Sequence, residues 1–369
     1  MEIIDADGHV NDGAGQEEIA KYMPAGNRSS QIFPTLDHLH FHYLRPEANR
    51  SGLENPGPDE WIRFLDETGI SRSVLYPTFG LAVGRFVSEH WAIAACRAYN
   101  NWLHEKFTSK NSRLKGMALI PIQDVEASVA ELRRAVTELG MLGGMLPSNG
   151  EGIKDHLGAK CYWPLYEEAE NLGCSLAVHV GSLHHLGMDG FSIYYPVHAL
   201  GHPFGIAIQA ASLLAHGIFE KFPKLRVAFL EGGSTWVPFF LDRLDRSYHP
   251  GHLQVDFHGR LVGGPKEGEK ASDYLRRQIR EGRIFVGFDV DDDGLGFAVQ
   301  KAGRDAFIFG SDFPHEVFNA QKCRKEIDAL LNRPDLSRED KEAVLGGNAA
   351  NFYGLSPSGL KREKIPSLP

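Results

Sequence analysis

The stretch Ile3-Ile4-Asp5-Ala6-Asp7-Gly8-His9-Val10 begins the chain as an apolar strand that ends in two potential metal ligands. Side chains two positions apart on a strand leave the same face, so the carboxylate of Asp7 and the imidazole of His9 are expected to converge. Gly8 between them allows another part of the protein to approach the backbone. Because the pattern is short, an ordinary strand whose polar end carries Asp and His is the alternative interpretation.

Composition and charge limit the class of protein. The chain has 369 residues, of which 42% are hydrophobic and 24% charged, enough for two average domains or one large α/β barrel. Its formal net charge of −9 comes without a block of basic residues. Nothing therefore supports binding to a phosphate backbone, and nucleic acid is excluded as a partner.

Targeting segments and cysteine motifs are absent from the sequence. No apolar run approaches the roughly 20 residues that cross a bilayer, and Glu2 and Asp5 stand where a signal peptide would carry basic residues. We therefore expect a cytoplasmic protein without a membrane partner. The four cysteines form no C-x-x-C pair, so we expect reduced thiols that neither bind zinc nor form a redox pair.

Short apolar strands alternate with helical segments along the chain. The eight expected strands cover residues 3–10, 73–77, 115–121, 143–147, 174–180, 225–231, 283–289 and 306–312. With no composition shift to mark a linker, the alternation predicts a single domain over residues 1–369, an α/β protein with a (β/α)8 TIM-type barrel. An open doubly wound sheet is the structural alternative, and it is disfavoured because no glycine-rich phosphate turn follows the first strand.

Three long irregular insertions interrupt the alternation, near residues 11–58, 181–205 and 249–272. We expect them to lie as loops over the C-terminal mouth of the barrel, where active sites of this fold are found. The first insertion contains His38-Leu39-His40-Phe41-His42, whose alternating histidines imitate a ligand cluster. Because no strong strand signal surrounds them, a lid or substrate loop is the better interpretation.

Side chains suited to metal binding or proton transfer stand at the ends of several expected strands. These residues are Asp7, His9, His179, Glu231, Asp289 and Asp312. Each residue, taken singly, could have a purely structural role: a hydrogen-bonded histidine of the core, a salt-bridged glutamate, or an aspartate that caps the next helix. Together they indicate one site, because carboxylates and imidazoles are costly to bury unless they are paired or bound to a metal.

The chain also resembles a known family over nearly its whole length. The resemblance rests on Asp5-Ala6-Asp7-Gly8-His9-Val10, on Val178-His179-Val180, and on the segments 217–233, 310–315 and 348–354. These motifs are similar, in this order, to the "amidohydrolase 2" branch of the amidohydrolase superfamily. That branch includes aminocarboxymuconate semialdehyde decarboxylase, the resorcylate and carboxyvanillate decarboxylases, and related hydratases. The resemblance implies a distorted (β/α)8 barrel with a divalent metal at its mouth.

The same resemblance assigns the metal ligands. Asp7 and His9 take the places of the family's first-strand H-x-H pair, His179 that of its fifth-strand histidine, and Asp312 that of its eighth-strand aspartate. Asp7 is a departure from the histidine of the motif, although some decarboxylase members carry a carboxylate there. Two carboxylates and two imidazoles suit one divalent ion; zinc is the first expectation, with manganese and iron as alternatives.

Three further residues are the expected catalytic groups. At the sixth-strand position, where some decarboxylases have a catalytic histidine, this chain has Glu231, which argues against a direct copy of their proton-transfer step. His202, in a His-Pro-Phe motif, and His315, three residues beyond Asp312, resemble residues of the same branch. We expect both histidines to line the site.

These features predict a metal-dependent lyase or hydrolase, which means a decarboxylase, a hydratase or a hydrolase. Its substrate would be a small carboxylated aromatic or unsaturated acid. The metal would chelate the substrate or lower the pKa of bound water to near 7. Glu231, His202 or His315 would move the proton. The resemblance also implies a homo-oligomer, expected to be a dimer.

Two other functions stay open from the sequence. The departures at Asp7 and Glu231, with the acidic run at 289–293, are compatible with a non-catalytic metal-binding subunit of a hetero-oligomer that contains a catalytic paralogue. A dinuclear iron or manganese oxygenase on the same barrel is the other alternative. Glu231, His202 and Asp289 would then supply the additional ligands.

Overall fold

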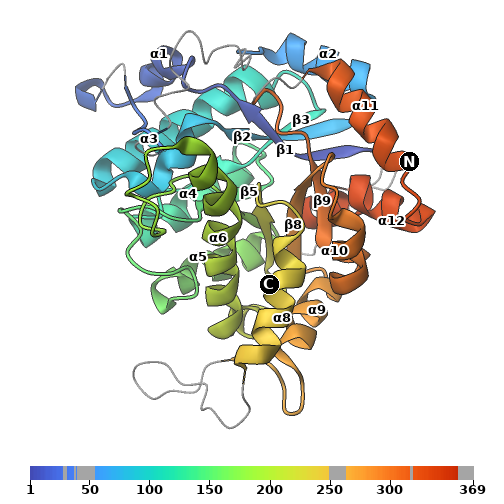
Figure 1. The fold of residues 1–369 in the computed structure, drawn as a ribbon. Helices are drawn as coiled ribbons and strands as arrows, with labels where there is room; N and C mark the ends of the chain where they lie inside the picture. Colours follow the sequence, from blue (N-terminus) through green and yellow to red (C-terminus); the bar gives the residue numbers. More distant parts are fainter. Residues whose placement is uncertain (28–30, 37–38, 40–54, 249–262, 316–318, 356–369) are drawn as a thin grey trace, which may run out of the picture.

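The computed structural model describes residues 1–27, 31–36, 39, 55–248, 263–315 and 319–355. Parallel strands alternate with helices along this chain (Figure 1). The strands are β1 Ile4–Val10, β2 Arg72–Pro77, β3 Leu114–Gly116, β4 Ala118–Leu119, β5 Gly143–Pro147, β6 Ser175–His179, β7 Arg226–Leu230, β8 Ile284–Asp289 and β9 Phe307–Gly310. They match the expected strands, the third of which is divided at Met117 into β3 and β4.

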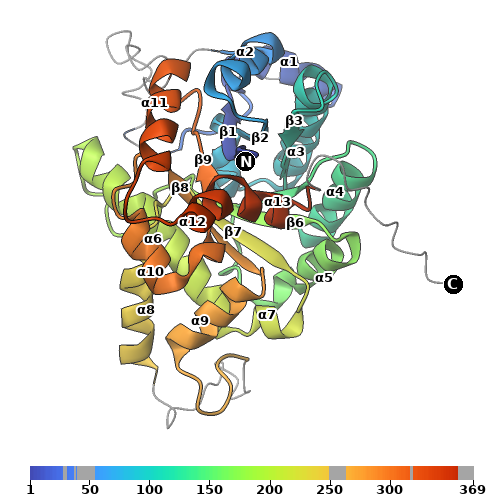
Figure 2. The ribbon, with the colours of Figure 1, turned by 90° about the vertical axis from the view of Figure 1, so that its right-hand side faces the viewer.

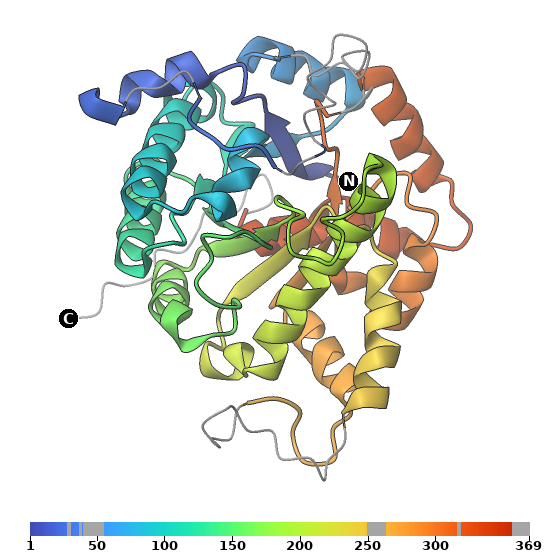
Figure 3. The same cartoon turned by 60° about the vertical axis from the view of Figure 1, so that its left-hand side comes forward.

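The helices form the outer layer. They are α1 Gln16–Ile19, α2 Pro58–Thr68, α3 Glu89–Leu103, α4 Val125–Thr137, α5 Trp163–Leu172, α6 Tyr194–Ala215, α7 Ile218–Lys221, α8 Trp236–Ser247, α9 Ala271–Arg280, α10 Leu295–Ala302, α11 Ala320–Leu331, α12 Arg338–Glu342 and α13 Asn348–Tyr353. A 3-10 segment covers Phe79–Arg85, directly after β2. Figures 2 and 3 show the helices surrounding the strands. The strands are buried almost throughout, as expected for parallel strands covered by helices.

The strands pair in sequence order, which is the order that a barrel requires. One ladder joins β1, β2 and β3, and a second joins β4 through β9. The first ladder continues past β3, where the backbone N–H of Met117 donates to the carbonyl of Leu75 at 3.1 Å. β1 and the segment after β9 meet through two further bonds, from Asp312 N to Asp7 O at 2.9 Å and from His9 N to Phe313 O at 2.7 Å. These contacts close the ring, and the predicted (β/α)8 barrel is confirmed.

A buried carboxylate reinforces this closure. Asp5 accepts hydrogen bonds from the hydroxyl of Ser73 on β2 at 2.5 Å and from the hydroxyl and backbone N–H of Ser311 at 2.9 and 2.8 Å. Burial raises the pKa of Asp5 to about 6, although these hydrogen bonds act in the opposite direction. Asp5 thus ties the first strand to its neighbours on both sides.

β1 contains an irregularity next to the expected ligands. Asp5 pairs with Ser73, whereas Gly8 pairs with Leu75, so β1 has one more residue than β2 over this interval. Such bulges redirect side chains and are frequent beside active sites. Gly8 is needed here, because a Cβ atom would lie 2.6 Å from the ring of Trp61 and 2.5 Å from the hydroxyl of Ser73. The expected close approach to Gly8 is thereby confirmed.

The insertion near 181–205 differs from the prediction. Its second part is helical, because α6 begins at Tyr194 and continues through Pro203 to Ala215. The proline and the absence of a strong polar–apolar period hid this helix in the sequence. The run 38–42 lies, apart from Leu39, outside the described residues, as do 40–54 and 249–262. The lid interpretation of the first insertion therefore stays a prediction.

The lengths of the helices and the state of the cysteines relate to the expectations about membrane spans and reduced thiols. In the described parts of the chain, no helix combines the length and the apolar composition needed to span a membrane. Cys96, Cys174 and Cys323 are buried and Cys161 is exposed, and all four are free thiols.

Candidate metal centre and active site

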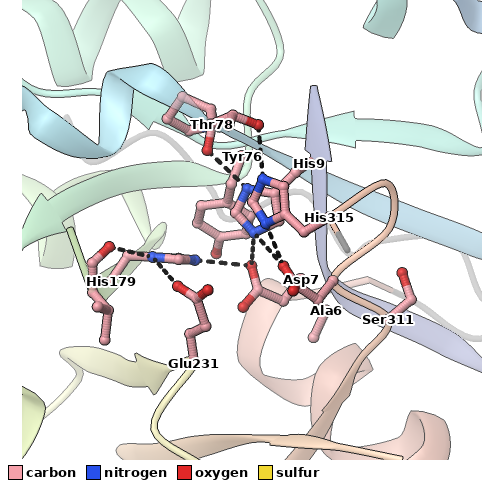
Figure 4. A network of polar contacts seen from close by, with 12 residues as sticks. Ala6, Asp7, His9, Tyr76, Thr78, His179, Glu231, Ser311 and His315 are labelled. Carbon is pink, nitrogen blue, oxygen red and sulfur yellow. Dashed lines mark hydrogen bonds and ion pairs between the residues drawn. The ribbon is translucent and has the colours of Figure 1, made fainter. Parts of the chain in front are cut away.

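Three of the expected ligands, Asp7, His9 and His179, meet at the carboxyl ends of the strands (Figure 4), and the fourth, Asp312, lies next to His9. Asp7 and His9 come from β1, His179 ends β6, and Asp312 follows β9. Oδ1 of Asp7 lies 3.2 Å from Nε2 of His179 and 3.4 Å from Nε2 of His9. Nε2 of His9 is also 3.4 Å from Oδ1 of Asp312. Gly310 leaves room for this arrangement, since a Cβ atom there would lie 2.9 Å from that of Asp7.

Hydrogen bonds to backbone carbonyls determine which nitrogen of each imidazole carries a proton. Nδ1 of His9 lies 2.8 Å from the carbonyl oxygen of Pro77, and Nδ1 of His179 lies 2.7 Å from that of Val180. A carbonyl can only accept, so both Nδ1 atoms must donate. In the neutral rings both Nε2 atoms are then lone pairs that face carboxylate oxygens. Nitrogen lone pairs and carboxylate oxygens that converge in this way can be satisfied by a bound metal ion or by a proton on the imidazole.

The burial of these side chains is a further indication of a metal site. Nε2 of His9 is fully buried and has no hydrogen-bond partner, a state that is costly unless another group satisfies it. Burial also lowers the pKa of His9, with the charge of His315 acting in the same direction, which favours the neutral ring that binds a metal. Burial by itself raises the pKa of Asp7, but the neighbouring His179 and His9 lower it overall, so the carboxylate is ionised. Asp7, His9 and His179 therefore form a group that could hold one divalent cation, and Asp312 lies within reach of His9 and His315 in a second such group.

His315 lies beside the candidate ligands and contacts two of them, His9 and Asp312. Its ring packs at 4.1 Å from the ring of His9, and its Nδ1 is 2.7 Å from Oδ1 of Asp312. Its Nε2 is 2.8 Å from the hydroxyl of Thr78, which follows β2. Burial lowers the pKa of His315, yet Asp312, Asp7 and Asp12 raise it overall above its usual value. The expected catalytic histidine is thus in the site, where it orients a ligand carboxylate.

Glu231 lies beside the ring of His179 and contacts its other nitrogen, Nδ1 (Figure 4). Its Oε2 is 3.4 Å from Nδ1 of His179, and its side chain is 16% exposed. Glu231 and Asp312 both have positive φ angles, 62° and 52°, which non-glycine residues rarely adopt. Such strain is typical of functional positions at strand ends.

The turn that carries Glu231 is held by the neighbouring loop. Asp292 accepts hydrogen bonds from the backbone N–H of Ser234 at 2.6 Å and from that of Gly294 at 2.9 Å. The guanidinium of Arg333 donates to the carbonyl oxygens of Asp292 and Asp293 at 2.7 and 2.9 Å. The acidic run that follows β8 therefore supports the site, and one of its carboxylates fixes the Glu231 turn.

Asp289, at the end of β8, is a further acidic residue at the mouth of the barrel. The residue as a whole is exposed to solvent, whereas other protein groups surround its carboxyl group. Desolvation by the surrounding protein raises its pKa well above the usual value, and the charges of Asp312, Asp291 and Asp7 add to the effect. A carboxyl group whose pKa is raised in this way is a candidate proton donor.

His202 has a different position. It lies on α6, half-buried, with its ring 3.9 Å from that of His198. Among the described residues, the groups that could hold an ion are Asp7 with His9 and His179, and His9 with Asp312 and His315. His202, Glu231 and Asp289 belong to neither group, so the dinuclear alternative gains no geometric support. The role of His202 stays a prediction.

Sequence reasoning did not single out the residues that support the ligands. Thr78 orients His315, Asp292 holds the Glu231 turn, and Asp5 connects β1 to the Asp312 segment through Ser311. In the sequence, only the acidic run at 289–293 pointed to a role for Asp292. Hydroxyl and carboxylate side chains with a supporting role have no spacing rule of their own, because their partners are distant in sequence.

Comparison with known proteins gives consistent results. A family model described as amidohydrolase matches residues 4–355. A 2-amino-3-carboxymuconate-6-semialdehyde decarboxylase of Dictyostelium discoideum is 26% identical over 303 residues, 82% of this chain and 77% of the relative. A 2-keto-4-carboxy-3-hexenedioate hydratase of Sphingobium sp. is 25% identical and covers 98% of both chains. The crystal structure of a dihydroxybenzoic acid decarboxylase from Polaromonas sp., with bound manganese and 2-nitroresorcinol, superposes with a TM-score of 0.69. It is 22% identical and covers 96% of this chain and 97% of its own.

Proposed function

The chain belongs to the amidohydrolase family, and we propose that it is a metal-dependent lyase or hydrolase that acts on a small carboxylated aromatic or unsaturated acid. The observation that carries the proposal is the convergence of two imidazole lone pairs and two carboxylates. Nε2 of His9 and of His179 face oxygens of Asp7 and Asp312 within 3.4 Å. The relatives, two decarboxylases and a hydratase, support the substrate class.

Asp7, His9, His179 and Asp312 would hold one divalent ion. When bound, such an ion acts as a Lewis acid toward the substrate's carboxylate and adjacent oxygen, or toward water. The harder carboxylate ligands favour manganese or zinc over a soft ion. The manganese bound in the Polaromonas structure supports manganese as the ion. Zinc, the first expectation from the sequence, stays a prediction.

We assign proton transfer to Glu231 and Asp289. In a decarboxylation the carbon–carboxylate bond breaks, and the carbon left behind takes up a proton. We assign the donation of that proton to Asp289 at the end of β8, because desolvation and the neighbouring carboxylates raise its pKa and so favour its protonated form. In a hydration, a base must instead remove a proton from water, and Glu231 at the end of β7 has the required carboxylate. His315 is held between Asp312 and Thr78, so we assign it to positioning as well as to proton transfer.

Two measurements on the purified chain test the proposal. Elemental analysis of protein that has not met a chelator is expected to find one transition ion per chain. Turnover of a panel of dihydroxybenzoates, carboxyvanillate-type acids and carboxylated muconates should stop after dialysis against a chelator and return with the ion. A chain with a full metal complement that turns over none of these acids would favour the non-catalytic subunit, especially if a paralogue copurifies. Absence of metal would overturn the proposal.

A further inference from the structure

Side chains bind both ends of one peptide group in the bulge of β1. Ala6 and Asp7 together lie opposite the single residue Val74, and the C=O of Ala6 and the N–H of Asp7 form one planar group. The N–H of Asp7 donates to Oδ1 of Asp5 at 3.2 Å. The C=O of Ala6 accepts from the phenol of Tyr353 at 2.6 Å. These two side chains take the part that a neighbouring strand has in a regular ladder.

Tyr353 reaches the bulge from the opposite end of the barrel. It is the last residue of α13, which packs against β1, β7 and β9 (Figure 2). The carbonyl oxygen of Phe352 accepts from the hydroxyl of Ser175 and, at 2.9 Å, from Nε of Arg226. Ser175 and Arg226 are the first residues of β6 and β7. α13 therefore lies at the amino ends of the strands, and the buried phenol extends from there into the barrel.

A second buried tyrosine fixes the direction of the hydrogen bonds. The phenol oxygens of Tyr76 and Tyr353 are 2.8 Å apart. Because the carbonyl of Ala6 can only accept, the proton of Tyr353 is directed to Ala6, and Tyr76 donates to Tyr353. Burial raises the pKa of Tyr353 well above its ordinary value, although the hydrogen bond with Tyr76 opposes this effect. The neutral phenol is thus the donor near neutral pH.

The orientation of this peptide group determines where the Asp7 carboxylate points. A peptide group is rigid, so bonds to both its N–H and its C=O fix its plane and the direction in which the next Cα atom lies. Oδ1 of Asp7 is 3.2 Å from Nε2 of His179 and 3.4 Å from Nε2 of His9. The ring of Tyr76 lies beside both imidazoles, with its centroid 5.4 Å from that of His179 (Figure 4). Rotation of the peptide plane would move the carboxylate away from them.

We propose that Tyr353 is a positioning residue for the metal ligand Asp7, which it orients through the carbonyl of Ala6. This assignment rests on the proposed function, in which Asp7 binds the ion. The last helix of the barrel then contributes to metal affinity from the end opposite the site. Residues that orient a ligand typically change metal affinity about 10–100-fold when they are replaced.

A purely structural role has a different consequence. If Tyr353 only joined α13 to the barrel, loss of its hydroxyl would lower the stability of the metal-free fold and leave the geometry of the ion unchanged. The two roles therefore differ in the affinity for the ion and in its absorption spectrum.

The test is Co²⁺ binding to the full chain after treatment with a chelator, measured by competition with a chromophoric chelator. Tyr76→Phe is the matched control, because it removes a buried hydroxyl but keeps the bond from Tyr353 to Ala6. It should bind Co²⁺ about as tightly as wild type. Tyr76→Phe combined with Tyr353→Phe removes that bond as well, and its dissociation constant should be about 10–100-fold higher. The visible absorption bands of bound Co²⁺ should shift only in the double variant.

Urea unfolding of the metal-free variants measures the fold separately, and both should unfold in one cooperative transition. Equal Co²⁺ affinities and spectra in the two variants would overturn the role of Tyr353 and leave the proposed function intact. A wild-type chain that binds no Co²⁺ would overturn both.

Hydrogen exchange of the wild-type chain gives a second measurement that needs no variant. Coupling between two sites is reciprocal, so an ion held by Asp7 must in turn favour the docked position of α13. Amides of α13 should slow on addition of Co²⁺ by a larger factor than those of α9, which packs on α8 and β8. Equal factors in the two helices would contradict the proposal.

Discussion

Nε2 of His179 lies 3.2 Å from Oδ1 of Asp7, although the two residues are 172 positions apart and belong to β6 and β1. Since Nδ1 of His179 donates to the carbonyl of Val180 at 2.7 Å, its Nε2 can face the carboxylate only as a lone pair or as a protonated imidazolium. Both residues are buried. A shared cation would satisfy both groups.

Replacement of His179 should remove the metal. His179→Ala takes away one of two neutral nitrogen ligands, so we expect loss of the bound ion and a fall in kcat/KM of at least 100-fold. Elemental analysis and turnover measure the two effects. His185→Ala is the matched control, since His185 is an exposed histidine on the loop after β6, and it should keep both. Full metal content and activity in His179→Ala would refute the ligand assignment.

Asp7 should influence which metal is bound. Asp7→His restores the H-x-H pair of the family motif and replaces a hard anionic ligand by a neutral imidazole. We expect the variant to keep a metal but to shift the zinc-to-manganese ratio upward several-fold. Elemental analysis after growth in medium with equal amounts of the two ions measures this ratio. An unchanged ratio would show that Asp7 does not determine the preference.

Glu231 should affect turnover without affecting metal content. Glu231→Gln keeps the shape of the side chain but removes the carboxylate that moves a proton, so kcat should fall by about 10²–10⁴-fold. The ligands are unchanged, and the ion should stay bound at its wild-type stoichiometry. If the variant loses its metal in parallel with its activity, Glu231 acts through His179, its neighbour at 3.4 Å, and not as a base.

Asp292 should act through the Glu231 turn. Asp292→Asn replaces one carboxylate oxygen by an amide nitrogen that cannot accept the hydrogen bond from Ser234 or Gly294. We expect kcat to fall roughly tenfold, the size of other supporting-residue effects, while KM and metal content change little. Asp293→Asn, an exposed neighbour on the same loop, is the control and should be close to wild type. Equal effects in both variants would contradict the assigned role.

His315 should make the stability of the metal-free protein depend on pH. Its pKa in the folded chain is raised above the ordinary value of 6.5, mainly by Asp312 against the opposing effect of burial. The imidazolium therefore stabilises the folded state fully below pH 6.5, and this contribution is lost as the pH rises through the folded-state pKa. Urea unfolding after chelation should show the largest difference between wild type and His315→Gln below pH 6.5. A difference that does not vary with pH would contradict the prediction.

The barrel could be predicted from the sequence because local patterns determine strands and helices. Apolar runs of four to eight residues alternated with helical periods, and the strand end at His179 was correctly placed, whereas β9 ends at Gly310, two residues before the expected end at Asp312. The prediction was wrong for residues 194–205, which belong to α6. Helix–barrel packing there outweighs the local effect of Pro203.

The positions of the candidate ligands could also be predicted, because they lie in or next to strands that the sequence marks: Asp7 and His9 in β1, His179 at the end of β6, and Asp312 after β9. Their role as metal ligands stays a prediction. Their mutual distances, the bulge that orients Asp7, and the hydrogen bonds that determine the tautomers could not be predicted, since they depend on contacts between strands far apart in the chain.

The sequence alone determined the order of the strands, the nature of the residues at their ends and the family resemblance, because these depend on neighbouring residues. Only the tertiary structure decided that Asp292 supports Glu231, that His315 holds Asp312, and that the last helix, α13, bonds to the first strand, β1. These features arise when the barrel closes and brings residues from different strands and loops within bonding distance, which no local pattern in the sequence specifies.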